Sequence, residues 1–149
     1  MPANPETTRR SLCPINAFVE IFGDRWSLLI VRDLMMRGYT TYTQLGSGEE
    51  RIATNILAEK LDRLVAAGVI ERAPDPEDGR RVCYRLTEKG IDLAPVIAAI
   101  ARWSLGHEPN RTPRRLVERI RKQPEAFVAE LRRRWAERST DPLLPLPKA

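Results

Sequence analysis

The sequence is poor in the residue types that build catalytic and metal centres. Its 149 residues include two cysteines and one histidine, too few for a ligand cluster with zinc spacing. It also has no glycine-rich phosphate loop and no recognisable arrangement of a nucleophile with a histidine. We therefore expect no enzyme, no metal and no cofactor. Two cysteines do not make a disulfide framework, so we expect a reducing compartment, the cytoplasm.

Long apolar runs are also missing. No segment approaches the roughly 20 apolar residues of a membrane span, so we expect no membrane partner. Residues 1–11 carry charge without a following apolar core, which is unlike a secretory signal, and we expect them to form a flexible tail. Hydrophobic residues make up 42% and charged residues 30% of the chain, as in ordinary globular domains.

Negative charge balances positive charge in most of the chain, and an excess of positive charge appears only near its end. Residues 1–109 hold 14 Lys/Arg against 15 Asp/Glu, whereas residues 110–138 hold 10 against 4. The isoelectric point near 9.7 therefore comes from the later segment. A basic segment suggests a polyanionic partner, but charge runs are more often simply solvated helix faces.

The centre of the chain has a distinctive order of elements. Apolar spacing and the expected caps predict four helices, with a short third helix at residues 41–45 and a fourth running from about Thr54 to Ala67 and ending at Gly68. A strand over residues 69–73, a turn and a strand over 81–86 form a hairpin. A long helix over residues 87–107 follows, kinked at Pro95. The fold class predicted is α+β, mostly helical, with a winged helix-turn-helix domain.

Such a domain would contact DNA with the helix over residues 54–67 and with its hairpin. The second helix of a helix-turn-helix pair enters the major groove, where polar side chains reach base edges, and other groups hold the phosphates. The hairpin, or wing, would lie on the backbone or in the minor groove. The candidate DNA-binding residues are Thr41, Thr43, Gln44, Thr54, Asn55, Lys60, Arg63, Arg80 and Arg81. The acids of the wing tip, PDPEDG, would have to point away from phosphate.

Four separated motifs resemble the HxlR family of bacterial transcriptional regulators, winged-helix relatives of the MarR family. They are CPINAFVEIFGDRWSLLIVRDL, TYTQL, IATNILAEKLDRLVAAGVIER and YRLTEKGIDLAPVIAAIARW, which occur in this order over roughly residues 12–107. The resemblance implies double-stranded DNA as the partner, a role as repressor, and a homodimer paired through N-terminal and C-terminal helices. A dimer would bind a near-palindromic operator. The DPEDGRR wing tip is closer to that of the MarR relatives.

The resemblance also divides the chain and suggests a signal. A winged domain over residues 12–108 precedes a basic helical extension over 109–138 and a Pro-rich tail over 139–149. Cys13, at a helix N-terminus, is a candidate redox sensor for an electrophile or oxidant; packing against the partner is the alternative. The candidate dimer-interface residues are Trp26, Trp103, Phe127, Leu131 and Trp135.

Two further interpretations remain open. The winged helix could be a protein-interaction module, which the near-neutral first 109 residues would favour. Alternatively, the protein binds DNA but responds to a small ligand held in the dimer cleft.

Overall fold

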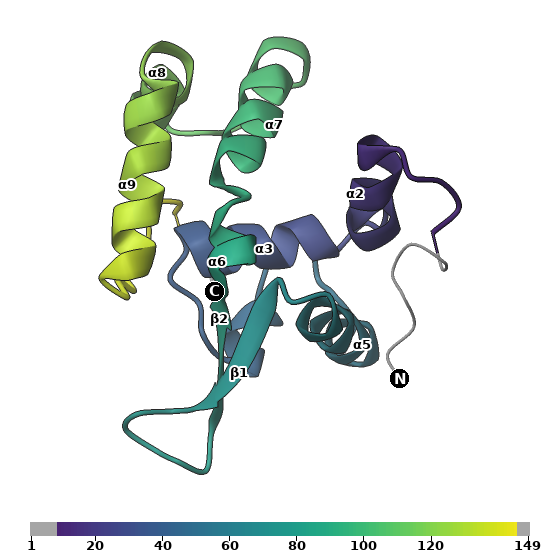
Figure 1. Ribbon diagram of the computed structural model, residues 1–149. Coiled ribbons are helices and arrows are strands. Elements are labelled where there is room, and N and C mark those ends of the chain that lie inside the picture. Colours follow the sequence, from purple (N-terminus) through teal and green to yellow (C-terminus); the bar gives the residue numbers. More distant parts are fainter. Residues whose placement is uncertain (1–8, 146–149) are drawn as a thin grey trace.

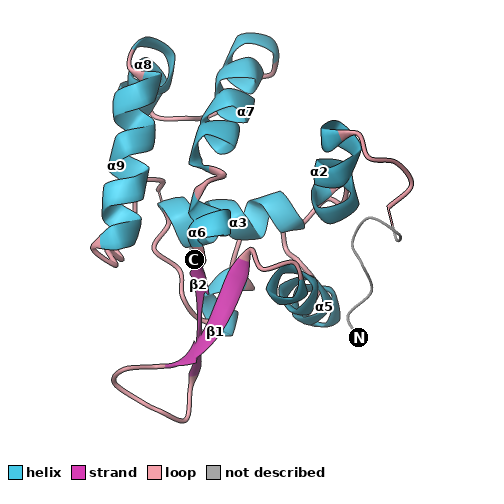
Figure 2. Cartoon of the chain, in the orientation of Figure 1, coloured by secondary structure: helices cyan, strands magenta, loops and turns pink. Residues whose placement is uncertain are grey.

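The protein consists of helices arranged around one small antiparallel hairpin (Figures 1 and 2). The computed structural model describes residues 9–145. Its elements, in chain order, are α2 (Pro14–Phe22), α3 (Ser27–Met36), α4 (Tyr42–Leu45), α5 (Thr54–Ala66), β1 (Ile70–Pro74), β2 (Val82–Leu86), α6 (Glu88–Ile91), α7 (Ala94–His107), α8 (Arg114–Lys122) and α9 (Pro124–Ala136). The predicted class, a mostly helical winged helix-turn-helix, is confirmed.

The helices of the central motif begin and end at residues with specific capping roles. The Asp24 carboxylate accepts hydrogen bonds from the backbone N–H groups of Trp26 and Ser27, both at 2.9 Å, and so starts α3. Gly38 and Gly68 follow α3 and α5 with φ of 69° and 73°. Only glycine adopts this left-handed conformation without steric cost, so both are effective helix terminators.

The wing is a regular two-stranded ribbon. β1 and β2 pair antiparallel, with Ile70 opposite Leu86 at the base and Pro74 opposite Val82 at the far end. The segment before α4 lies along the other edge of β2, where the Tyr84 N–H donates to the Thr40 carbonyl oxygen at 2.7 Å. The wing is therefore attached to the helix-turn-helix at the middle of β2.

The prediction of a single kinked helix over residues 87–107 is wrong. α6 ends at Ile91 and α7 begins at Ala94, with Pro95 in the first turn of α7. A proline inside a continuous helix would clash with the carbonyl four residues earlier, whereas in a first turn it loses no hydrogen bond. Ile91 and Ala94 are both buried at this corner, so packing holds the break in place.

The C-terminal helices complete the core of the same chain. α8 and α9 pack against α7, and Phe127 and Leu131 of α9 have exposed fractions of 1% and 0%. Trp135 is half-buried, and its Nε1 donates to the Leu86 carbonyl oxygen at 2.8 Å. The prediction that Phe127 and Leu131 form a dimer interface is therefore wrong, because both side chains are buried within one chain.

The segment after α9 returns to α3. The N–H groups of Leu143 and Leu144 donate to the Met36 carbonyl oxygen at 2.7 and 3.3 Å. The backbone of Thr140 lies so close to Gly38 that a Cβ there would be 2.1 Å from the Thr140 oxygen. The expected Pro-rich tail is thus packed as far as residue 145. Residues 146–149, and residues 1–8 of the expected N-terminal tail, lie outside the described residues.

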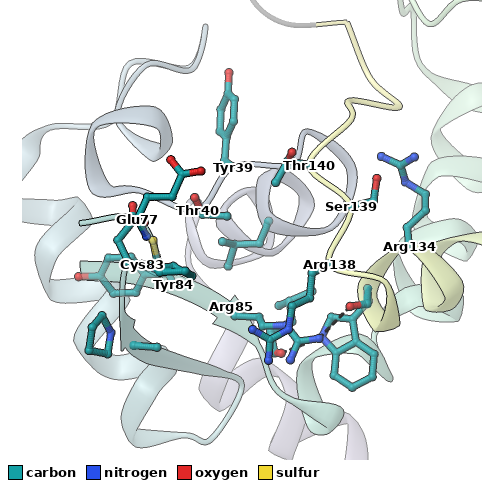
Figure 3. A pocket seen from close by; sticks show the side chains of 18 residues that line it. Tyr39, Thr40, Glu77, Cys83, Tyr84, Arg85, Arg134, Arg138, Ser139 and Thr140 are labelled. Carbon is teal, nitrogen blue, oxygen red and sulfur yellow. Dashed lines mark hydrogen bonds between the residues drawn. The ribbon is translucent and has the colours of Figure 1, made fainter. Parts of the chain in front are cut away.

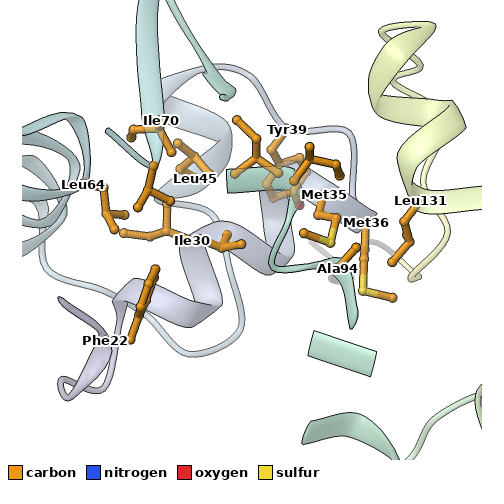
Figure 4. Close-up of a cluster of buried hydrophobic side chains, with 14 of the residues drawn as sticks. Phe22, Ile30, Met35, Met36, Tyr39, Leu45, Leu64, Ile70, Ala94 and Leu131 are labelled. Carbon is orange, nitrogen blue, oxygen red and sulfur yellow. The ribbon is translucent and has the colours of Figure 1, made fainter. Parts of the chain in front are cut away.

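One hydrophobic core links all these elements (Figure 4). Its buried side chains run from Phe22 of α2 through Ile30 of α3 and Leu64 of α5 to Leu131 of α9. Because α3 contacts α5, β2 and α9, the recognition elements and the C-terminal helices share one support. Within the described residues, no helix is both long and apolar enough to cross a membrane.

Candidate nucleic-acid interface

The first turn of α5 is presented to solvent and firmly held. Thr54 and Asn55 are exposed, whereas Leu57, Leu61 and Leu64 on the opposite face are buried. An exposed Asn in the first turn of such a helix has the donor and acceptor that match an adenine edge. This turn therefore has the geometry of a DNA-reading surface.

Two polar contacts fix the position at which α5 begins. The Tyr42 hydroxyl of α4 donates to the Thr54 carbonyl oxygen at 2.6 Å. In the loop before α5, Arg32 of α3 binds both carboxylate oxygens of Glu50, at 2.7 and 3.2 Å. This hydrogen bonding by Arg32 lowers the pKa of Glu50 despite partial burial. The α4–α5 connection is thereby tied to α3.

The two basic residues of α5 differ in their availability to DNA. The Lys60 side chain is 12% exposed, and its Nζ lies 3.8 Å from a Glu59 oxygen and 4.0 Å from an Asp24 oxygen. Lys60 is therefore directed toward the turn between α2 and α3, and its predicted role at the groove is not supported by this geometry. Arg63 is exposed, with Nη2 3.5 Å from the Glu20 carbonyl oxygen, a weak contact that leaves its guanidinium available.

The predicted backbone-contacting residues of α4 are partly used by the helix itself. The Thr41 hydroxyl accepts from the Gln44 N–H at 3.2 Å, and the Gln44 Oε1 accepts from the N–H groups of Thr40 and Thr41 at 2.9 and 3.1 Å. This reciprocal arrangement is a capping box. Thr43 is exposed and is the residue of this set that is free to meet a phosphate.

In the wing tip, Asp75 and Asp78 accept hydrogen bonds from the backbone of their own turn, and the two arginines are exposed. The Asp75 carboxylate accepts from the N–H groups of Glu77 and Asp78, at 2.8 and 3.4 Å, and these bonds lower the pKa of Asp75. Asp78 accepts from the Arg80 N–H at 3.1 Å. Both carboxylates thus serve as turn acceptors. Arg80 and Arg81 are exposed, Arg81 in a loose pair with Asp78 at 3.9 Å.

α5 and the wing project from the same side of α3, whereas the basic C-terminal helices lie on the other side (Figure 1). Much of the charge on those helices is paired. Arg132 binds Asp92 at 2.9 Å, Arg133 lies 3.4 Å from Glu137, and Arg119 pairs with Glu130. The basic segment is therefore remote from the surface formed by α5 and the wing, and its arginines are largely engaged within the chain.

The two cysteines have different surroundings. Cys13 is exposed at the start of α2, whereas Cys83 is half-buried in β2, and both thiols are free. Burial raises the pKa of Cys83, and the adjacent Asp75 carboxylate raises it further. Less of the Cys83 thiol is therefore ionised at neutral pH than in an ordinary exposed cysteine, so Cys83 is a weaker nucleophile. Within residues 9–145, no three His, Cys, Asp or Glu side chains could hold a metal ion together.

Sequence reasoning missed contacts that shape this surface. The hydroxyl of Tyr42 had no assigned role, although an aromatic residue in a short polar helix could have drawn attention to it. Arg72 of β1 forms an ion pair with Asp62 of α5 and lies over the Tyr84 ring, 5.9 Å from its centre. The pair joins the wing to α5, and nothing in the local sequence indicates it.

Comparison with known proteins identifies the family. The model of the HxlR-like helix-turn-helix family matches residues 21–112. The uncharacterized HTH-type transcriptional regulator YvaP of Bacillus subtilis is 33% identical over 94 residues, which cover 62% of this chain and 86% of YvaP. Among solved structures, PA1607 has a TM-score of 0.61 at 34% identity, covering 70% of this chain and 77% of that chain.

A second regulator of B. subtilis, YodB, matches in sequence and in structure. Its reduced form gives a TM-score of 0.56 at 30% identity, covering 67% of this chain and 99% of YodB. The family match spans more than half of this chain and includes α3, α5 and the wing. This protein therefore belongs to the HxlR-like helix-turn-helix family of transcriptional regulators.

Proposed function

We propose that this protein is a homodimeric repressor that reads a near-palindromic DNA site with α5 and holds the backbone with its wing. The observation that carries the proposal is the shared orientation of two surfaces. α5 and the wing project from the same side of α3 (Figure 1), and Thr54, Asn55, Arg80 and Arg81 on them are exposed. Two acids of the wing tip, Asp75 and Asp78, accept hydrogen bonds from the backbone of their own turn.

Each exposed residue has a distinct role in this complex. Asn55 and Thr54 face the base edges in the major groove, and Arg63 binds a phosphate at the groove rim. Arg80 and Arg81 hold the backbone or enter the minor groove, where guanidinium groups meet the most negative potential. Thr43 positions the neighbouring phosphate.

Dimerisation is supported by exposed apolar side chains away from the DNA-reading surface. Ile15 of α2 is 74% exposed and Trp103 of α7 is 59% exposed; Val19 of α2, Ile100 of α7 and Leu12 just before α2 are exposed as well. Large apolar groups in such numbers are typical of surfaces that bind a partner. A two-fold pair joined there carries two reading helices roughly 34 Å apart, one DNA turn.

The signal that we favour acts at Cys13. This thiol is exposed beside the apolar residues of α2, so its modification would alter the dimer and the spacing of the two reading helices. YodB has been solved in reduced and in quinone-bound forms. A small ligand in the dimer cleft is the alternative signal, and blocking the thiol with iodoacetamide would then leave DNA affinity unchanged.

Fluorescence anisotropy of the reduced protein tests the proposal. Duplexes tiled from the DNA upstream of its own gene are titrated beside a scrambled duplex at the same salt concentration. We expect roughly a thousandfold preference or more for one tile. Asn55→Ala should lose most of this preference, whereas Arg133→Ala, on the opposite side of the molecule, should keep it.

Equal and weak binding to every duplex would overturn the proposal. The winged domain would then be a protein-docking module, and the basic C-terminal segment would account for the residual attraction to DNA. If Asn55→Ala kept the preference for one duplex, the protein would still be a specific DNA-binding protein, but α5 would not be the element that reads the bases.

A further inference from the structure

Four charged side chains come together where the end of α3 meets the α4–α5 turn, residues 46–51. The side chains of Asp33 and Arg37, on the last turn of α3 and at its C-cap, are 6% and 9% exposed. Arg32 precedes Asp33, and Glu50 belongs to the turn. The cluster carries two positive and two negative charges. Because burying charged groups is costly unless they are paired, the partners of each group matter.

Asp33 is shared by two arginines. Its Oδ1 accepts a hydrogen bond from Arg32 at 2.9 Å and lies 3.2 Å from Nη1 of Arg37. Burial raises the pKa of Asp33, although the positive charges of both arginines act to lower it. Arg32 also binds both carboxylate oxygens of Glu50. A continuous chain of charges therefore runs from the buried Arg37 through Asp33 and Arg32 to the turn.

The Arg37 guanidinium also lies close to the turn. A Cβ built on Gly48 would be 4.0 Å from Arg37 Nη1 and 3.0 Å from Oε2 of Glu50. The Nε and Nη1 atoms of Arg37 are buried, and within the described residues neither has a hydrogen-bond partner; the approach of Nη1 to Asp33 is an ion pair without hydrogen-bond geometry. Unsatisfied buried donors cost free energy, so hydrogen bonding does not explain why an arginine is held here.

The C-terminal segment, residues 139–145, holds the backbone on either side of Arg37. Two of its N–H groups donate to the Met36 carbonyl oxygen, at 2.7 and 3.3 Å, and the backbone of Thr140 lies against Gly38. A pocket of about 420 Å³ lies between this segment and the wing (Figure 3), and its walls include Tyr39, Thr40, Cys83, Trp135 and Thr140. The end of α3 is thus held in place by a segment beyond residue 112, where the family match ends.

We propose that Arg37, paired with Asp33, is a positioning residue for DNA reading, which fixes the α4–α5 turn and so the first turn of α5 with Asn55. It acts through the turn and does not touch DNA itself. A buried ion pair adds little net stability compared with neutral side chains of similar size, and its best-attested use is to select one arrangement among several. The inference rests on the proposed function, because it assigns a further residue to the same DNA-reading site.

The test removes the inner ion pair in one double variant, Asp33→Asn with Arg37→Met. Arg32 and Glu50 stay paired, so the cluster remains neutral. We expect a melting temperature at or above that of the wild type, because replacing both partners of a buried ion pair commonly leaves stability unchanged or higher. Arg37→Met alone should melt at a lower temperature than the double variant, since it leaves the buried Asp33 with one partner.

Two measurements then follow the turn and its effect on DNA. In hydrogen exchange without DNA, the Arg51 amide, which donates to the Gly48 carbonyl oxygen at 3.1 Å, should exchange faster in the double variant. In anisotropy titrations, the preference for the best duplex over the scrambled one should fall roughly tenfold. Arg133→Gln with Glu137→Gln is the matched control, because it removes an exposed pair of the same four-residue spacing on α9. It should change neither measurement.

Three results would each overturn the proposal. Unchanged exchange of the Arg51 amide in the double variant would show that the pair does not hold the turn. Faster exchange with an unchanged duplex preference would show that the turn does not govern DNA reading. A double variant that melts below the wild type, or no higher than Arg37→Met alone, would make the pair an element of fold stability. If the wild type itself prefers no duplex, the proposed function fails, and exchange at Arg51 still decides whether Arg37 holds the turn.

Discussion

Replacing Leu131 with alanine separates a residue of the monomer core from a residue of a dimer interface. Leu131 has an exposed fraction of 0% and lies in the cluster that joins α9 to α3 and α7. Buried Leu→Ala substitutions lose transfer free energy and leave a cavity, together about 3–5 kcal/mol. For a chain of this length each kcal/mol lowers the melting temperature by about 2–4 °C. We therefore expect a decrease of about 6–20 °C.

Thermal unfolding followed by circular dichroism at low and high protein concentration provides the assay. The decrease caused by Leu131→Ala should be the same at both concentrations, because the lost contacts lie within one chain. Trp103→Ala is the contrasting variant, since Trp103 is 59% exposed. Its main effect should be weaker self-association, seen as a lower melting temperature at high concentration only, where mass action stabilises the dimer.

A Leu131→Ala protein that melts within about 1 °C of the wild type would refute this reasoning, because a filled core position cannot be emptied at so small a cost. If Leu131→Ala left the stability of the monomer unchanged and weakened dimerisation, Leu131 would instead belong to the dimer interface.

Three further predictions concern the wing, the loops and pH. Arg81→Gln should reduce the slope of log affinity against log salt concentration by about 1 for each protomer that loses a phosphate contact; an unchanged slope in anisotropy titrations would remove Arg81 from the DNA surface. Gly38→Ala should lower the free energy of unfolding by about 1–3 kcal/mol in urea titrations, because Gly38 has a φ of 69° and a Cβ there would meet Thr140. Gly106→Ala is the control: the space around Gly106 is open, so this substitution should not destabilise the protein. Arg32 lowers the pKa of Glu50 in the folded protein from its ordinary value of 4.5. The ion pair therefore stabilises the fold fully above pH 4.5, and this contribution is lost as the pH falls through the folded pKa. Glu50→Gln should therefore be less stable than the wild type at neutral pH and equally stable in acid; a stability difference that is constant with pH would contradict this assignment.

The parts of the fold that sequence reasoning predicted are those determined locally. The spacing of Leu57, Leu61 and Leu64 indicates the buried face of α5, and Gly68 has the positive φ expected of a helix terminator. The class of the fold and the family follow from several such local signals in the correct order.

The features that were wrong, unsupported by the geometry or missed depend on long-range packing. Phe127 and Leu131 form an apolar stripe that looks the same whether it meets a partner or its own chain. Lys60 shares the polar side of α5, but its long side chain reaches Asp24, which is distant in sequence. The pocket beside Trp135 joins residues about 100 positions apart along the chain, and no local pattern indicates it.

The central claim is that two copies of α5 occupy successive major grooves, and site-directed DNA cleavage measures this directly. An Ala53→Cys variant, made in a background with Cys13→Ser and Cys83→Ser, carries an iron chelate at the exposed residue that caps the start of α5. Bound to its preferred duplex, it should cut at two centres about one helical turn, roughly 34 Å, apart. Uniform cutting, or none above that of the chelate alone, would contradict the account.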